Sequence, residues 1–285
     1  MSLRIIINAD DLGRNHQVNS AISEALSLQL ITSSTIMANS TTWEEIHGIV
    51  SKNPQASFGV HLNLTEGKAM TSSDVFHKLD VVDANNCFTK KIREIKRPSR
   101  ELLDAVYNEW DAQINKVLNV EKIRVSHFDG HHHIHGDYVF RKILIRLCEK
   151  YGVYNIRNRY VSPVTGMRYV VSAVFRAMSM IPCAMNFASR MSILGKPFAY
   201  MYGVMERSCW QNQVKRVVHT PDYFNSYESI CEMLKLGMTY PMDSIIEIMC
   251  HPGHPNYAKE YEMMKLHTIN KYLSDYTLIN YSELK

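Results

Sequence analysis

Two adjacent carboxylates, Asp10 and Asp11, follow an apolar run that extends from Leu3 to Ile7. A short run rich in β-branched residues is typical of a buried strand. Two charges at the end of a buried strand are unfavourable unless a cation compensates them. A divalent metal is the usual compensation, so this pair predicts a metal-dependent active site.

Three further predicted strands end in side chains that bind metals or exchange protons. One strand ends near His61, a second leads into the segment 127–135, and a late strand leads into His251. Each has an ordinary explanation when taken alone, such as a core histidine, a hydrogen-bonded loop or a turn. In a parallel α/β fold, however, the carboxyl ends of all strands lie on one face, where such folds place their active sites. The four ends together therefore indicate one metal site.

One carboxylate and two imidazoles, with positions left open for water, are typical of a hydrolytic metal site. A metal held in this way lowers the pKa of its water and polarises a carbonyl oxygen. A second carboxylate beside it can act as the base. Asp10 and Asp11 suit this division because neighbouring side chains on an extended chain point in different directions.

Strand and helix patterns alternate along most of the chain. Strands are predicted at 3–7, 34–37, 57–62, 123–128, 153–157, 217–220, 244–249 and 276–279. The clearest helix begins near Ser99, and another begins at Asp137 and ends at Gly152. Thr42 and Glu45 have the spacing of a capping box. About eight strands with helices between them favour a (β/α) barrel, or a distorted TIM-type barrel with long loops, over a doubly wound open sheet.

The chain of 285 residues is predicted to form one domain, 1–285. A less regular, Met-rich insertion at about 160–215 interrupts the alternation. A stretch of this kind could cover a pocket, pair two subunits or add a helical layer to the core. A homodimer is therefore compatible with the sequence.

The overall composition restricts the classes of partner. A formal net charge of +4, without a basic block carrying interleaved aromatics, does not indicate nucleic-acid binding. The six cysteines are scattered and form no C-x-x-C pair, which predicts reduced thiols. Asp10 and Asp11 interrupt the first apolar run too early for a usual signal peptide, and charged residues break the longest apolar stretch. We expect a cytoplasmic protein without nucleic-acid or membrane partners.

The chemically interesting segments resemble the YdjC-like carbohydrate deacetylases, a family that includes the bacterial chitooligosaccharide deacetylases. The matching segments are Asn8–Gly13, Gly59–Thr65, His127–His135 and His251–Gly253, and they follow one another in the family's order. The resemblance implies a barrel-like α/β fold. It also implies hydrolytic removal of an acetyl group from an N-acetylated sugar, so that a small carbohydrate is the expected substrate.

The same resemblance implies one divalent metal ion, Mg or Zn, held by Asp11, His61 and His131. On this basis Asp10 is the expected general base for the attacking water. His251, as its imidazolium, is expected to protonate the departing amine, a role that histidine suits near neutral pH.

Two further residues are assigned to substrate binding by this resemblance. Asp222 lies in the segment Thr220–Phe224, and Arg157 follows the fifth predicted strand, where the family places an arginine facing the site. Arg157 could equally be a structural ion-pair partner. Asp129 or another carboxylate is expected to orient a ligand imidazole from behind.

Two other functions stay open at this point. A phosphoesterase-type metallohydrolase on the same barrel would favour a two-metal cluster and more converging Arg and Lys side chains than the strand ends offer. A non-catalytic protein that binds sugar or metal would need neither Asp10 nor His251. The presence of both residues favours an enzyme.

Overall fold

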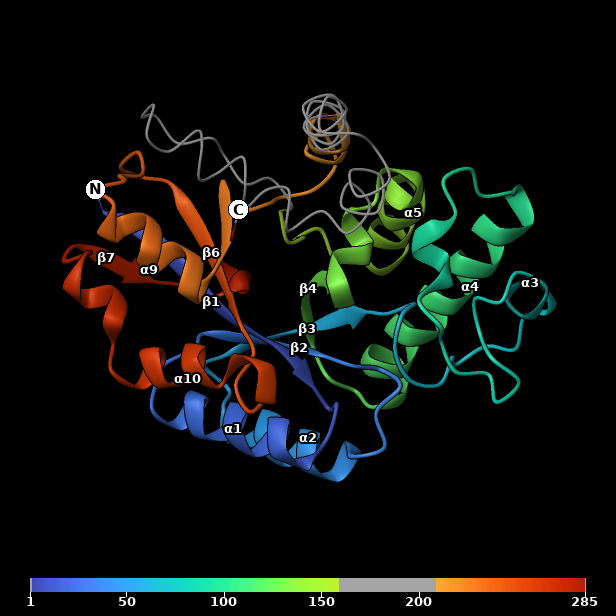
Figure 1. Ribbon diagram of the computed structural model, residues 1–285, viewed down its shortest axis with the longest axis horizontal. Helices are drawn as coiled ribbons and strands as arrows, with labels where there is room; N and C mark the ends of the chain where they lie inside the picture. The colour runs from blue at the N-terminus through green and yellow to red at the C-terminus, as the bar shows by residue number, and fades with distance from the viewer. Residues whose placement is uncertain (1, 159–208, 285) are drawn as a thin grey trace, which may run out of the picture.

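The computed structural model describes residues 2–158 and 209–284 (Figure 1). Within these residues, seven strands form one sheet in the order β4-β3-β2-β1-β6-β5, with β7 paired to β1. The strands are β1 (Leu3–Leu12), β2 (Ser33–Ile36), β3 (Ser57–Leu62), β4 (Val125–Gly130), β5 (Tyr223–Ser226), β6 (Ile245–Cys250) and β7 (Tyr276–Leu278). The ladders between them are parallel, so the carboxyl ends of the strands share one edge.

Helices follow most of the strands and cover the outer face of the sheet. The α-helices with assigned bounds are α1 (His16–Ser27), α2 (Trp43–Lys52), α3 (Asp74–Lys78), α4 (Arg100–Asn115), α5 (Arg141–Tyr151), α9 (Tyr227–Lys235) and α10 (Ala258–Lys265). Figure 1 shows α1, α2 and α10 on one side of the molecule and α4 with α5 on another. Helix α1 contacts α2, α4 contacts α5, and α9 contacts α10. The predicted α/β fold with a parallel sheet is confirmed.

The two faces of the central strand, β1, differ: one is packed in the main core, and the other changes from apolar to polar along the strand. Ile5 and Ile7 point into the main core beneath the helices. Ile6 lies on the opposite face, in a small apolar cluster with Tyr281. Asp10 lies on the same face as Ile6, four residues further along the strand. The inner side of the sheet is therefore apolar near the amino end of β1 and polar near its carboxyl end.

Two helix ends agree with the sequence, and two differ from it. The Ser99 hydroxyl caps α4 by accepting from the backbone N–H of Leu102, and Gly152 ends α5 in a left-handed conformation with φ of 67°. The helix predicted from Asp137 begins as a 3₁₀ turn and becomes α-helical only at Arg141. The capping box predicted at Thr42 is wrong, because the Thr42 side chain makes no cap bond and instead accepts from the Asn19 amide of α1.

The strands predicted at 153–157 and 217–220 are reduced to isolated bridges, and β5 is a strand that the sequence does not predict. Ile156 pairs in parallel with Phe128 of β4, and Asn155 pairs in parallel with His219. The sequence does not predict strand β5, because the strand is only four residues long and contains Asn225, a residue type that is depleted in strands. The predicted insertion at 160–215 lies outside the described residues except for 209–215, where 209–214 are helical.

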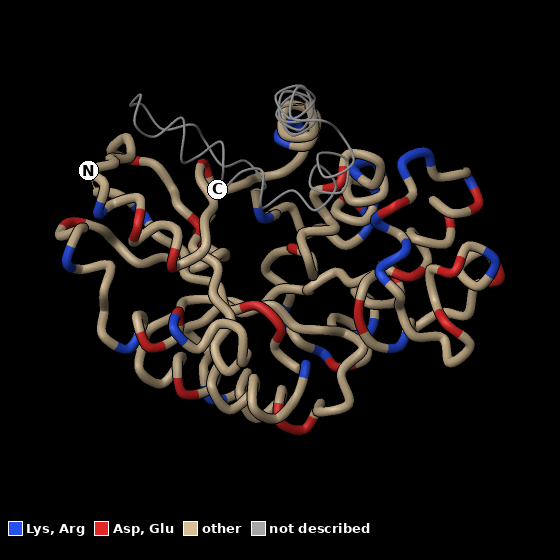
Figure 2. The backbone as a smooth tube through the Cα atoms, in the orientation of Figure 1, with Lys and Arg blue, Asp and Glu red and all other residues tan. Residues whose placement is uncertain are grey.

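The charged residues of the described backbone are mixed rather than segregated. Figure 2 shows Lys and Arg next to Asp and Glu along the same outer segments. The full chain contains nearly equal numbers of basic and acidic residues, 32 and 28. In the described ranges, no helix combines the length and the apolar character needed to cross a bilayer.

Candidate active site

An irregular backbone at the carboxyl end of β1 brings both aspartates to the same cavity. The register between β1 and β2 shifts between Ala9 and Leu12, and Asp11 has a φ of 72°. Aspartate adopts this left-handed conformation more readily than most residues, although it remains strained. Because the shift interrupts the regular alternation of side chains, Asp10 and Asp11 both line the cavity.

The cavity lies at the shared carboxyl edge of the strands and has a volume of about 430 Å³. This volume falls within the range of roughly 300–1,000 Å³ that is usual for small-molecule sites. Its lining includes every residue predicted for metal binding and catalysis, namely Asp10, Asp11, His61, His131 and His251. The structure therefore brings together residues that are up to 241 positions apart (251 − 10) in the sequence.

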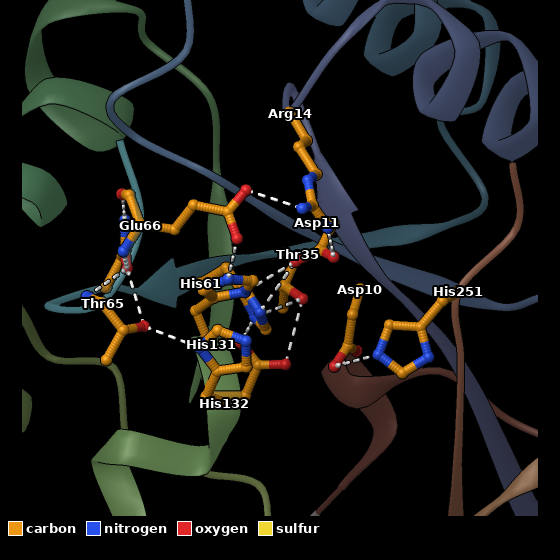
Figure 3. A network of polar contacts seen from close by, with 12 residues as sticks. Asp10, Asp11, Arg14, Thr35, His61, Thr65, Glu66, His131, His132 and His251 are labelled. Carbon is orange, nitrogen blue, oxygen red and sulfur yellow. Dashed lines mark hydrogen bonds and ion pairs between the residues drawn. The ribbon is translucent and has the colours of Figure 1, made fainter. Parts of the chain in front are cut away.

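Asp11, His61 and His131 form a compact group of ligand-capable atoms (Figure 3). Asp11 Oδ1 lies 2.9 Å from His131 Nδ1 and 3.3 Å from His61 Nε2. All three side chains are buried, and their ligand-capable atoms lie within 4.8 Å of one another. A carboxylate and two imidazoles suit a divalent cation and leave positions for water and substrate. Burial would raise the pKa of Asp11, but its contacts with both histidines hold it well below the usual value.

The outward-facing nitrogen of each imidazole meets another carboxylate. His61 Nδ1 lies 2.7 Å from Asp129 Oδ1, and His131 Nε2 lies 3.0 Å from Glu66 Oε2. Carboxylates in this position fix the tautomer and the orientation of a ligand histidine. The geometry agrees with the expectation for Asp129. Glu66 was not predicted, although it directly follows the segment Gly59–Thr65 that carried the family resemblance.

Asp10 is held by Arg157. Two terminal nitrogens of Arg157 donate to the two oxygens of Asp10 at 2.7 and 2.6 Å, and Arg157 Nε donates to Glu247 Oε1 at 2.7 Å. Arg157 Nη1 also lies 2.9 Å from Asp129 Oδ2. Burial would raise the pKa of Asp10, but the Arg157 guanidinium outweighs it and lowers this pKa far below the usual value. Asp10 is thus ionised and fixed in orientation.

His251 approaches Asp10 from β6 and the turn that follows it. His251 Nε2 lies 3.9 Å from Asp10 Oδ2, its Nδ1 lies 3.6 Å from Glu260 Oε1, and its ring stacks on Tyr257 with centroids 4.2 Å apart. Burial would lower the pKa of His251, but Glu260 and the two aspartates raise it above the usual value. A raised pKa keeps the imidazolium populated near neutral pH, as a proton donor requires.

The consecutive histidines after β4 enter the cavity through strained backbone. His132 and His133 have φ of 52° and 59°, a conformation that costs non-glycine residues energy and tends to occur at functional positions. Both line the cavity beside His131. Burial and the neighbouring cations lower the pKa of His132 to about 3, and its Nδ1 lies 2.9 Å from the Thr65 hydroxyl. His132 forms a second ligand-capable group with Glu66, but that group shares His131 with the first.

The two residues predicted to bind substrate lie elsewhere. Asp222 is exposed and precedes the amino end of β5, where its carboxylate accepts from the backbone N–H of Ile245 at 2.9 Å. Asp222 thus supports the pairing of β5 with β6 and is not part of the cavity lining. Arg157 is fully buried among three carboxylates and does not line the cavity. Its position corresponds to the ion-pair alternative.

Comparisons with known proteins are consistent with this arrangement. A family model described as YdjC-like protein matches residues 4–280. A carbohydrate deacetylase of Halalkalibacterium halodurans is 27% identical over 300 residues, which cover 97% of this chain and 100% of that protein. A carbohydrate deacetylase of Oceanobacillus iheyensis is 34% identical over 153 residues, which cover 53% of this chain and 63% of that protein. A crystal structure from Enterococcus faecalis V583, described as a proposed cellobiose-phosphate cleavage protein, is 25% identical, covers 99% of this chain and 98% of its own, and has a TM-score of 0.67.

Proposed function

The chain belongs to the YdjC-like protein family, and from this premise we propose that it is a metal-dependent hydrolase that removes an acetyl group from an N-acetylated sugar or oligosaccharide. The observation that carries the proposal is the convergence of Asp10, Asp11, His61, His131 and His251 on one cavity. The relatives named carbohydrate deacetylase support the substrate class.

We assign one divalent ion to Asp11, His61 and His131. Two imidazole donors favour zinc over magnesium, which prefers oxygen ligands and keeps several waters. When bound, the ion would supply Lewis-acid polarisation of the acetamide carbonyl. Asp129 and Glu66 hold the two imidazoles from behind, so the ligand set is oriented before the ion arrives.

The remaining groups divide the proton transfers. Asp10, ionised and oriented by Arg157, takes a proton from the water that attacks the acetyl carbon. When the C–N bond of the resulting tetrahedral carbon breaks, His251 gives its proton to the departing amine. The products are acetate and the free amino sugar. The distance of 3.9 Å between Asp10 Oδ2 and His251 Nε2 supports this division, because a base and an acid for one substrate must border the same small volume.

The wider architecture fits the same proposal. The bridges at Ile156 and His219 lie between β4 and the segment that leads into β5, and we propose that they complete a distorted barrel around the polar interior. We further propose a single domain over 1–285 that acts in the cytoplasm. At the rim of the cavity, Tyr257 and Asn256 offer an aromatic face and an amide to a sugar ring.

The direct test measures acetate released from N-acetylglucosamine oligomers of one to five units, with chelator treatment followed by addition of zinc or magnesium. We expect release that chelation abolishes and zinc restores. His61→Ala should lose both bound metal and activity. His47→Ala, which changes an exposed histidine paired with Glu121, should lose neither. Absence of acetate release from the whole panel, with metal bound, would overturn the proposal.

A further inference from the structure

A continuous series of buried polar groups links the segment near residue 281 to Asp10. The Tyr281 hydroxyl donates to Glu247 Oε2, and Glu247 Oε1 accepts from Arg157 Nε at 2.7 Å. Arg157 in turn donates to both oxygens of Asp10. Tyr281, Glu247 and Arg157 are fully buried, and Asp10 is 3% exposed. The three groups behind Asp10 therefore lie out of reach of water and salt, and only Asp10 borders the cavity.

Tyr281 is itself firmly held. Its ring stacks on His127 with centroids 3.6 Å apart and planes 7° apart. Its backbone N–H donates to the Ser57 hydroxyl at 3.0 Å, and its backbone carbonyl accepts from the Asn155 amide at 2.7 Å. These contacts fix the backbone of Tyr281 beside Ser57, the first residue of β3, while its hydroxyl reaches Glu247 in the middle of β6.

The bond between Glu247 and Arg157 restricts the orientation of the Arg157 guanidinium. This guanidinium lies among Asp10, Asp129 and Glu247, and a planar fork can satisfy them only in one orientation. The bond from Nε to Glu247 sets that orientation, because it fixes the edge of the guanidinium that points away from Asp10. Glu247 keeps its own position through the hydroxyl of Tyr281 on its second oxygen.

We propose that Glu247 and Tyr281 are positioning residues for the reaction, which act by orienting Arg157 so that both of its terminal nitrogens face Asp10. This inference rests on the proposed role of Asp10 as the base. The segment Asn280–Leu284 then belongs to the catalytic apparatus, although it contacts neither the cavity nor the ligand group.

Tyr281→Phe tests this inference because it removes only the hydroxyl and keeps the stacked ring. We expect kcat to fall about tenfold, as is usual for loss of an outer partner, with KM within about twofold and bound zinc unchanged. Tyr151→Phe is the matched control, since Tyr151 donates to the Asp111 carboxylate at 2.9 Å on the outer helices. Both variants lose one tyrosine–carboxylate bond, but only the first should lose turnover.

Glu247 provides a second, independent comparison. Glu247→Ala removes the acceptor for Arg157 Nε, whereas Glu247→Gln keeps an amide oxygen there. We expect Glu247→Gln to restore most of the kcat that Glu247→Ala loses. If Tyr281→Phe does not fold, the comparison of Glu247→Ala with Glu247→Gln tests the inference in its place. Equal kcat per zinc-loaded molecule in these two variants would overturn it.

Asp10→Asn separates this inference from the proposed function. If Asp10→Asn retains full turnover, the assignment of Asp10 as the base fails and the positioning role fails with it. If Asp10→Asn is inactive while Tyr281→Phe turns over like Tyr151→Phe, the positioning role is refuted and the proposed function stands. Loss of turnover in Asp10→Asn and Tyr281→Phe, with Tyr151→Phe unaffected, supports both.

Discussion

Replacing Glu66 by Ala should weaken metal binding without removing any ligand. Glu66 Oε2 lies 3.0 Å from His131 Nε2, while His131 Nδ1 faces Asp11. Without the carboxylate, His131 loses the partner that fixes the orientation and the tautomer of its ring. Replacement of such a partner typically lowers metal affinity by about 10–100-fold.

The exposure of Glu66 determines where in that range the effect falls. Its side chain is 33% exposed, so water can replace part of the lost interaction. We therefore expect about a tenfold increase in the zinc dissociation constant, which corresponds to about 1.4 kcal/mol. Glu66→Gln should lie between Glu66→Ala and the unaltered protein, because its amide oxygen still accepts from the imidazole N–H.

Zinc affinity would be measured by competition with a chromophoric chelator at fixed pH, with metal content determined independently. Glu121→Gln serves as the matched control, because Glu121 lies 2.7 Å from His47 in a pair on the outer surface. A dissociation constant for Glu66→Ala within twofold of that for Glu121→Gln would refute the reasoning. It would mean that Asp11 alone fixes His131.

Three further predictions follow from other parts of the molecule. The proposed role of His251 requires its imidazolium, and the pKa of His251 is raised, so kcat/KM should be retained below that pKa and fall as pH rises through it. In His251→Ala the residual rate should be about 100-fold lower and lack this alkaline limb, and persistence of the limb would contradict the assignment. Arg157→Met leaves three buried carboxylates without their cation and should reduce the free energy of unfolding, measured by urea titration, by about 3–5 kcal/mol. An unchanged urea midpoint would refute this stabilising role of Arg157. Gly59→Ala places a Cβ 2.6 Å from the His127 ring and should lower the free energy of unfolding by about 1–3 kcal/mol. Gly48→Ala, whose Cβ would meet nothing within 4 Å, should not lower it, and equal unfolding midpoints for the two variants would count against this packing argument.

The sequence predicts the ligand-capable residues well because they follow strands that are themselves easy to recognise. His61 and Asp11 each end a hydrophobic run, and parallel pairing of the strands brings such ends to one edge. Local patterns cannot predict which distant side chains meet behind them. Arg157 is separated by 147 residues from Asp10 and by 90 from Glu247, so its role as an ion-pair centre depends on the folded chain.

Asp222 and Glu66 also show that local sequence patterns do not determine which side chains reach the site. Asp222 lies in a segment that resembles the family, yet it precedes its strand and so lies at the amino end of β5. Glu66 lies on a loop that no periodic pattern describes, and only the fold brings it to His131. In both cases, the position of a residue relative to its strand determines its role more than its type does.

The pairing of β1 has a consequence for how the protein folds. Arg4 of β1 pairs with Ile245 of β6 and with Thr277 of β7, so the central strand takes partners from far along the chain. Loop closure between such distant segments makes their pairing slow. While the chain is being synthesised, the start of the isoleucine run of β1 must wait with both of its edges unpaired, because Ile5 pairs with Ile246 on β6 and Leu278 on β7, which makes it a candidate for chaperone protection. The carboxylates beside that run then acquire their final surroundings among the last events of folding.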